Sequence, residues 1–179
     1  MHKKHGRNPA SSRPDITHQL LLTLLDSPLN KAGLLLIYVE TNAGVLIEVS
    51  PSLRIPRTFK RFAGLIVQLL EKLKVRAADS PETLLRVVKN PVTRHLPVGA
   101  PIVGLEAGAP LVEPFDLPSY APLALPEDGP IVFVIGAMSH GDVKADYIQH
   151  TVALSRYPLS AAGAAAKLCG AFERAWAVG

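Results

Sequence analysis

Apolar side chains recur at intervals of three and four residues in three stretches of the chain, a spacing that predicts amphipathic helices. The first helix is expected over 15–25, where Pro and Asp suit its start and residues 26–28 (DSP) end it. The second follows Thr58, a suitable N-cap. Its apolar stripe consists of Phe59, Phe62, Ile66, Leu69 and Leu73. The third runs over about 160–176 through an alanine-rich stretch.

Continuous aliphatic and β-branched runs predict strands between these helices. Runs at 34–39 and 45–49 flank a turn that contains Asn and Gly, which is typical of a hairpin. A Ser-Pro-Glu sequence at 80–82 predicts the start of a short helix. The nine prolines within 90–130 predict a long loop with one strand at 102–105, and IVFVI at 131–135 predicts a buried strand. Helices interspersed with apolar strands indicate an α/β fold.

The composition places the chain among folded proteins of about one domain. It has 179 residues, of which 48% are hydrophobic and 19% charged. No apolar run approaches the roughly 18 residues that a membrane-spanning helix needs, and the polar tail expected over 1–12 does not resemble a secretory signal. A single cysteine, Cys169, excludes an internal disulfide. We expect His2 and His5 to be solvated in the tail, so the sequence predicts no metal site.

Charge is distributed unevenly along the chain. Residues 1–95 carry 15 Lys and Arg against 7 Asp and Glu, whereas residues 96–179 carry 4 against 8. The basic first part favours a nucleic acid or another anionic partner, although solvated lysines would give the same count.

The sharpest charged motif is RIPRTFKR at 54–61, which has four cations immediately before and on the first turn of the second helix. Cations at a helix N-terminus oppose the helix macrodipole, so this placement costs stability unless an anion binds there. Free backbone N–H groups at the same end favour a phosphate. The alternative is a solvated basic loop.

A glycine loop, GAMSHG at 136–141, directly follows the strand predicted at 131–135. Small ligands tend to bind at such loops, at the carboxyl ends of strands in α/β sheets. The loop lacks the spacing of a dinucleotide fingerprint and of a nucleophile elbow, since Ser139 stands one place too late. The alternative is a tight turn without a ligand.

Six ordered motifs resemble the pseudouridine N1-specific methyltransferases of ribosome biogenesis, which belong to the SPOUT class. The resemblance extends from Gly6 to the C-terminus. The motifs are RPDITHQ (13–19), LDSPLNKAG (25–33), RIPRTFKRF (54–62), KNP (89–91), VIGAMSHG (134–141) and YPLSA (157–161).

The resemblance implies one methyltransferase domain over 13–179. Its fold would be a SPOUT-type sheet flanked by helices, with a C-terminal trefoil knot and without the strand and helix that relatives carry before residue 6. S-adenosylmethionine would bind to three loops of this knot. The implied cofactor-binding residues are Leu105, Gly136, Gly141, Leu154, Ser155, Arg156, Tyr157, Pro158 and Leu159. Many relatives carry asparagine where this chain has Arg156, so the added cation would either weaken binding of the positively charged sulfonium or engage RNA.

The same resemblance implies small-subunit rRNA as the substrate, methylated at N1 of a pseudouridine. The implied RNA-binding residues are Arg13, Asp15, Arg54, Arg57 and Arg61. Because N1 carries a proton, a base is needed, and Asp15 is the candidate. The protein would be a homodimer without membrane contact, working alongside small-subunit assembly factors in the nucleolus, or in the cytoplasm if it is not eukaryotic. The alternative function is a non-catalytic assembly factor that binds pre-rRNA.

Overall fold

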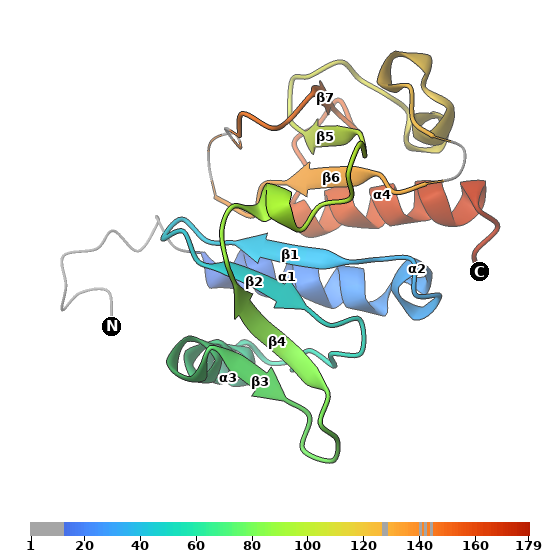
Figure 1. The fold of residues 1–179 in the computed structure, drawn as a ribbon. Helices are drawn as coiled ribbons and strands as arrows, with labels where there is room; N and C mark the ends of the chain where they lie inside the picture. The colour runs from blue at the N-terminus through green and yellow to red at the C-terminus, as the bar shows by residue number, and fades with distance from the viewer. Residues whose placement is uncertain (1–12, 127–128, 140, 142, 144) are drawn as a thin grey trace. The chain divides into compact units, whose positions relative to one another are not determined.

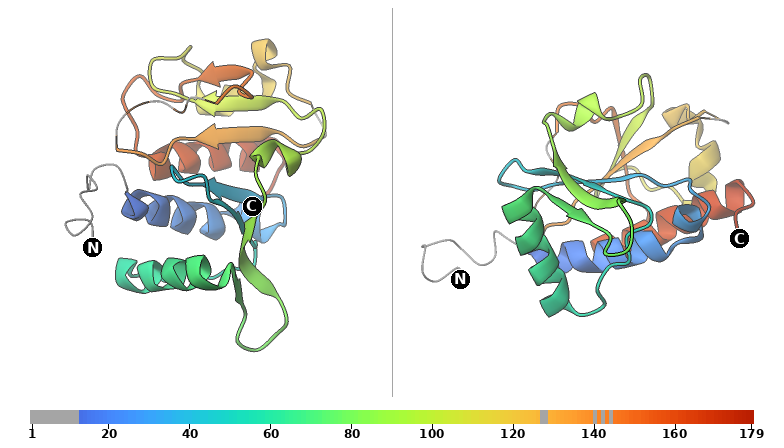
Figure 2. Two further views of the ribbon diagram at one scale, coloured as in Figure 1. Left: turned by 60° about the vertical axis from the view of Figure 1, so that its left-hand side comes forward. Right: turned by 60° about the horizontal axis from the view of Figure 1, so that its bottom comes forward.

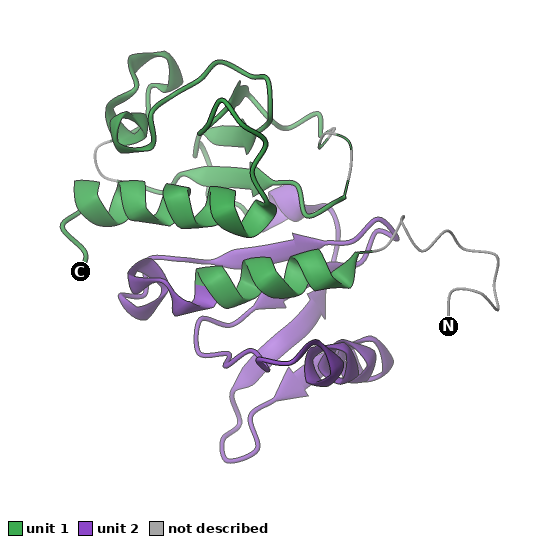
Figure 3. Cartoon of the chain, turned by 180° about the vertical axis from the view of Figure 1, so that it is seen from behind, with its two compact units in different colours: residues 1–24, 96–179 green, residues 25–95 purple. Residues whose placement is uncertain are grey.

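The computed structural model describes residues 13–126, 129–139, 141, 143 and 145–179. The chain forms two compact units, each with its own sheet (Figures 1 and 3). One unit combines residues 1–24 with 96–179, and the other comprises residues 25–95. Helix α1 (Pro14–Asp26) fulfils the prediction for 15–25 and ends where the chain enters the second unit.

The unit of residues 25–95 is an antiparallel sheet with the strand order β1-β2-β4-β3. Its strands are β1 (Ile37–Glu40), β2 (Leu46–Val49), β3 (Lys74–Arg76) and β4 (Thr83–Val88), and its helices are α2 (Pro28–Lys31) and α3 (Phe59–Lys72). The predicted hairpin is confirmed, although β1 begins at residue 37 because residues 34–36 remain outside the sheet. The Thr41 side chain accepts the Val45 N–H at 3.0 Å and helps close its turn.

Side chains alternate between the two faces of this sheet, and apolar residues are buried on both, since Leu46 is fully buried on the face that also carries Glu48. Ile47, Val49 and Leu85 are buried on one face, and the α3 residues Phe62 and Leu69 are also buried. Figures 1 and 3 show α3 packed on one side of this sheet. The predicted N-cap of α3 is Thr58, but its side chain makes no capping hydrogen bond.

The helix predicted from Ser80 is wrong, because strand β4 forms there instead. The Ser80 hydroxyl accepts the Glu82 N–H at 3.3 Å, which makes a tight turn rather than a helix cap. The sequence TLLRVV that follows is rich in β-branched and aliphatic residues and pairs with β2 on one side and β3 on the other. Two ladders of backbone hydrogen bonds therefore outweigh a local capping signal.

The other unit contains a parallel sheet with the strand order β6-β5-β7. The strands are β5 (Ile102–Leu105), β6 (Val132–Ile135) and β7 (His150–Val152), and helix α4 (Ala161–Ala175) contacts β6. Figure 2 shows α4 alongside this sheet from two further directions. Ser160 caps α4 by accepting the Gly163 N–H at 3.0 Å, as the predicted boundary requires. Val103, Val152 and Phe172 are almost fully buried in this unit.

The segment 90–130 contains more structure than the predicted loop. The strand expected at 102–105 is confirmed as β5, and three short 3-10 helices accompany it: η3 (Val92–Arg94), η4 (Pro114–Ser119) and η5 (Ala121–Leu123). The strand expected at 131–135 forms as β6 but is only half-buried, because within the described sheet it lies at an edge. Among the described residues no helix is long and apolar enough to cross a membrane.

Candidate functional site

The carboxyl ends of the three parallel strands meet at one edge of their sheet. Leu105 is in register with Ile135 on one side and with Val152 on the other. The chain therefore leaves β5, β6 and β7 at the same level, which brings three loops together. This edge, defined by Leu105, Gly136 and the segment 154–159, contains every cofactor-binding residue that the sequence predicts except Gly141, which ends the loop leaving β6.

Backbone hydrogen bonds tie the loop after β5 to the loop after β7. Ala153 donates its N–H to the Pro110 carbonyl at 2.9 Å, and its own carbonyl accepts the Val112 N–H at 2.9 Å. Leu111 and Ala153 also form a parallel bridge. The segment 154–159 therefore starts from a fixed point, and Ser160 fixes its other end as the cap of α4.

The segment 154–159 offers one apolar anchor and several accessible groups. Leu154 is buried, whereas Tyr157 is 79% exposed and Leu159 is 40% exposed. The Ser155 hydroxyl accepts the Tyr157 N–H at 3.0 Å and shapes the turn between them. An adenine ring needs apolar walls with main-chain donors and acceptors at its rim, and this segment can supply both.

Glycines lie at the start and the end of the loop that leaves β6. A Cβ atom on Gly136 would lie 3.1 Å from Val143 Cγ2 and 3.9 Å from Met138 Cε. Gly141 has a φ of +91°, a conformation that L side chains rarely adopt. Gly136 therefore lets Val143 pack closely against the start of the loop, while the space beside Gly141 is open. This fits the adenosyl and amino-acid parts of S-adenosylmethionine.

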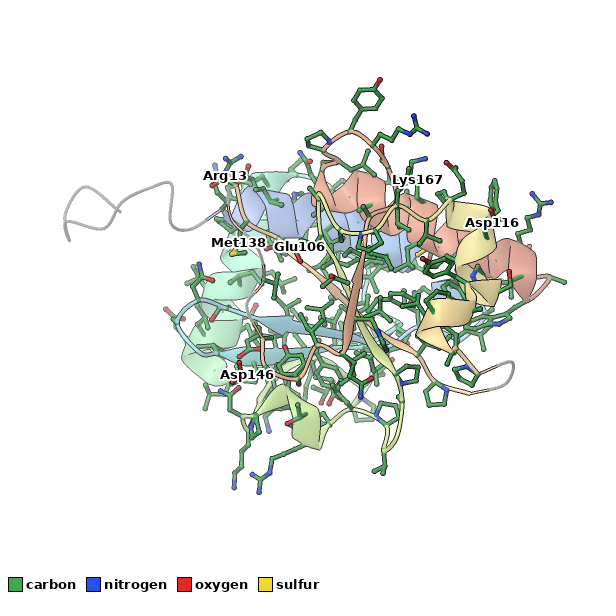
Figure 4. The ribbon with its side chains drawn as sticks, turned by 90° about the horizontal axis from the view of Figure 1, so that it is seen from above. Arg13, Glu106, Asp116, Met138, Asp146 and Lys167 are labelled. Atoms are coloured by element: carbon green, nitrogen blue, oxygen red, sulfur yellow. The ribbon has the colours of Figure 1, made fainter. Side chains whose placement is uncertain are left out.

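Two residues at this edge were not singled out from the sequence as binding residues. Glu106 follows β5 directly, donates its backbone N–H to the Val152 carbonyl at 3.0 Å, and is half-buried. Met138 is 37% exposed within the glycine loop. Figure 4 shows the two side chains at the same end of the parallel sheet. For Glu106, the signal in the sequence was its place immediately after a predicted strand.

Arg13 and Asp15 form a two-point ion pair at the start of α1. Arg13 Nε donates to Asp15 Oδ1 at 2.9 Å, and a terminal guanidinium nitrogen donates to Oδ2 at 2.7 Å. These hydrogen bonds lower the pKa of Asp15 and raise that of Arg13. The low pKa makes the carboxylate a weak proton acceptor. The geometry therefore suits Asp15 for orienting Arg13.

The basic cluster comprises Arg54, Arg57, Lys60 and Arg61, which are all exposed. Leu53 and Ile55 are buried and anchor the segment that carries it. No acidic residue lies in the first turn of α3, so the cations face an uncompensated helix N-terminus. This arrangement can bind a phosphate group.

The LDSPLNKAG motif supports the segment that leads to the basic cluster. Ser27 caps α2, and the Asn30 side-chain amide donates to the Leu25 carbonyl at 3.1 Å and to the Pro51 carbonyl at 2.9 Å. Lys31 and Asp26 form an ion pair at 2.8 Å. Lys31, with a smaller contribution from Arg57, lowers the pKa of Asp26. Arg57 therefore lies within electrostatic reach of this motif.

The predicted RNA-binding residues are divided between the two units. Arg13 and Asp15 belong to the unit that holds the parallel sheet, and Arg54, Arg57 and Arg61 belong to the unit of residues 25–95. Among the described residues, no three His, Cys, Asp or Glu side chains are grouped so as to hold a metal ion.

The chain is similar to known proteins over nearly all of its length. Residues 1–173 match the family described as EMG1/NEP1 methyltransferase. The human ribosomal RNA small subunit methyltransferase NEP1 is 55% identical over 98% of this chain and 69% of its own length. The Drosophila melanogaster protein of the same name is 52% identical over 98% of this chain and 71% of its own length.

A solved structure has a similar fold. Archaeoglobus fulgidus Nep1 bound to S-adenosylhomocysteine matches with a TM-score of 0.74 and 30% identity, covering 92% of this chain and 72% of its own. That ligand is the product left when S-adenosylmethionine gives up its methyl group.

Proposed function

The chain belongs to the EMG1/NEP1 methyltransferase family, and we propose that it transfers a methyl group from S-adenosylmethionine to N1 of a pseudouridine in small-subunit rRNA. The observation that carries the proposal is the meeting of three loops at the carboxyl edge of the parallel sheet. A solved relative with this fold holds S-adenosylhomocysteine. Methylation of small-subunit rRNA is the activity named for the relatives.

The residues of this edge would hold the cofactor. Gly136 and Gly141 leave room for close backbone approach, and Leu105 and Leu154 would form apolar walls for adenine. Ser155, Arg156, Tyr157, Pro158 and Leu159 would line the outer side. When bound, the sulfonium supplies an electrophilic methyl group. The glycine loop would exclude water from the path between donor and acceptor.

The arginines would bind and orient the RNA. Arg54, Arg57 and Arg61 would contact phosphates at the start of α3. Arg13, held by Asp15, would stabilise negative charge that develops on the pseudouridine ring as N1 gives its proton to solvent water. In this assignment Asp15 is a positioning residue, and the alternative is that its carboxylate accepts the N1 proton. The target base would leave its stack to reach the cofactor.

We also propose that the C-terminal segment forms a trefoil knot and that residues 13–179 act as one methyltransferase domain. The knot is supported by Ala153, which is hydrogen-bonded on both sides by the loop that follows β5. The unit that holds the parallel sheet takes its segments from both ends of the chain, so the two units cannot be separated by one cut. The protein would act as a homodimer with small-subunit assembly factors in the nucleolus.

The test is methyl transfer from labelled S-adenosylmethionine to a short rRNA hairpin that contains either pseudouridine or uridine. We expect label only in the pseudouridine hairpin. Label in both hairpins would overturn the specificity for pseudouridine. No label from a folded protein that still binds the hairpin would overturn the enzymatic assignment and favour the non-catalytic assembly factor.

A further inference from the structure

One face of the antiparallel sheet carries a row of polar side chains that crosses all four strands, next to the buried Leu46. Tyr38 is in register with Glu48, Glu48 with Arg86, and Arg86 with Lys74. Because side chains directly opposite in such a sheet point to the same face, these four lie side by side. We call this row, together with Arg76, Lys89, Arg94 and His95 at its two ends, the sheet surface.

Hydrogen bonds fix the middle of the row. One Arg86 guanidinium nitrogen donates to both Glu48 carboxylate oxygens, at 2.9 and 3.0 Å, and the Tyr38 hydroxyl donates to Glu48 at 3.4 Å. These contacts raise the pKa of Arg86, and burial together with Glu48 raises that of Tyr38. The Arg86 side chain remains more than half exposed, so it is oriented while still open to a ligand.

The segment after β4 folds back to complete one end of the row. The His95 ring lies against the Tyr38 ring, with a centroid distance of 5.5 Å and an angle of 33° between the planes. His95 Nε2 also lies 2.7 Å from the Lys89 carbonyl oxygen. These contacts bring the backbone at Lys89 and Arg94 beside the row. The KNP motif (89–91) is part of this segment. It belongs neither to the cofactor edge nor to the basic cluster.

Cations outnumber acids on the sheet surface. Its five cations are all exposed, namely Lys74, Arg76, Arg86, Lys89 and Arg94. Their carboxylate neighbours on the same face are Glu48 and, at the end of β1, Glu40. An excess of positive charge spread over a firm sheet suits an extended polyanion better than a single small anion.

We propose that the sheet surface is a second RNA-binding surface, which holds the backbone of rRNA outside the target nucleotide. This inference rests on the proposed function for the identity of the RNA. The large apolar side chains that are exposed in this unit lie on α3, just after it, or at residues 34–36, and the described strands expose none. The sheet surface therefore lacks the apolar centre of a protein–protein interface and matches phosphate groups.

The sheet surface is separate from the basic cluster around Arg57. That cluster lies at the start of α3, which packs against the opposite face of the same sheet (Figures 1 and 3). A short hairpin that fills the basic cluster would therefore leave the sheet surface empty. A longer rRNA segment is needed to reach both.

The test compares two RNAs: a short hairpin with the target nucleotide, and a longer small-subunit fragment that extends it on both sides. We would remove two charges at one end of the row in Lys74→Gln/Arg76→Gln and two at the other end in Lys89→Gln/Arg94→Gln. Lys167→Gln, an exposed lysine on α4, is the matched control. For each double variant we expect about tenfold weaker binding of the long fragment, with the salt slope reduced by about two.

Binding and methylation of the short hairpin should not change in either double variant. Unchanged affinity for the long fragment would overturn the proposal and leave an acidic protein as the candidate partner. Equal loss with both RNAs would also overturn it, because the two surfaces would then not be separate. If the unaltered protein methylates neither RNA, the proposed function fails, while the difference in binding still tests the sheet surface. Thermal melting of each variant would confirm that the fold is intact.

Discussion

Arg13 and Asp15 hold each other through two parallel hydrogen bonds of 2.9 and 2.7 Å, although only one residue separates them. The pair stands at the first turn of α1, where the helix N-terminus also favours a carboxylate. Both influences keep Asp15 ionised. A carboxylate stabilised in this way is a weak proton acceptor. It is therefore better suited to orienting Arg13 than to taking a proton from the substrate.

We expect Asp15 to titrate below its ordinary pKa of 3.8. A lowered pKa in the folded state stabilises the fold above the unfolded pKa, and this contribution is lost as the pH falls through the folded value. The difference in melting temperature between the wild type and Asp15→Asn should therefore be largest above about pH 5 and shrink toward pH 2. Carboxyl chemical shifts followed by NMR would measure the titration directly.

The Asp15→Asn variant also distinguishes whether Asp15 orients Arg13 or accepts the N1 proton. If Asp15 orients Arg13, Asp15→Asn should weaken methylation by about tenfold, chiefly through KM for the RNA, with the shape of the pH–rate profile unchanged. Loss of the acidic limb of that profile with KM intact would contradict this and make Asp15 the base.

The sequence predicted the elements whose signals are local. Helices α1, α3 and α4 form close to the expected residues because each combines an apolar stripe with a recognisable start. β4 was mistaken for a helix because its stability comes from pairing with β2 and β3, which lie far from it in the sequence. β7, with three residues, carries no pattern of its own and exists through its pairing with β5.

Only some parts of the candidate site could be predicted from sequence patterns, again because the other parts depend on pairing between distant segments. The glycine loop and the basic cluster stood out as short motifs, whereas the cofactor segment 154–159 was found only through a family resemblance. The position of this segment at the cofactor edge depends on the register of Leu105 with Ile135 and Val152. No sequence pattern reveals that register. The sheet surface was missed because its row draws one residue from each of four strands.

Gly136→Val should weaken cofactor binding while RNA binding persists. The added atoms would press on Val143, whose Cγ2 lies 3.1 Å from the position of a Cβ. Overpacking of this kind costs about 1–3 kcal/mol, and if this cost falls on the bound state, the affinity for S-adenosylhomocysteine should fall about 5- to 150-fold in calorimetry. Gly170→Ala in α4 is the control, because its Cβ would meet nothing within 4 Å. Equal affinity in Gly136→Val and wild type would remove this loop from the cofactor site.

Arg57→Ala should weaken binding of the short rRNA hairpin about tenfold and reduce its salt slope by about one, because a phosphate contact is lost. Affinity for S-adenosylhomocysteine should not change. The comparison variant is Lys167→Ala, which removes an exposed cation from α4. If hairpin affinity and salt slope are the same in Arg57→Ala and wild type, the basic cluster does not bind this RNA.

Phe172→Ala should lower the free energy of unfolding by about 3–5 kcal/mol, because it leaves a cavity in the core of the parallel-sheet unit. Phe172 is 4% exposed and lies between the rings of Phe133 and Trp176, at centroid distances of 5.4 and 4.9 Å. Phe115 is 60% exposed beneath the Arg174 guanidinium, so Phe115→Ala should cost no more than about 1 kcal/mol. Urea unfolding of both variants would contradict this ranking if Phe115→Ala proved the more damaging.

Arg156→Asn should strengthen binding of S-adenosylmethionine. Arg156 is exposed in the segment 154–159, so its charge is partly screened but would still repel a sulfonium bound at the proposed cofactor site. Removing it should raise the affinity about two- to threefold at low salt and leave it unchanged near 1 M salt, where the Debye length is about 3 Å. The affinity for S-adenosylhomocysteine, which is neutral at sulfur, should change less. Equal effects on both ligands would show that Arg156 acts through contact rather than charge, and a loss of hairpin affinity would place it on the RNA side of the site.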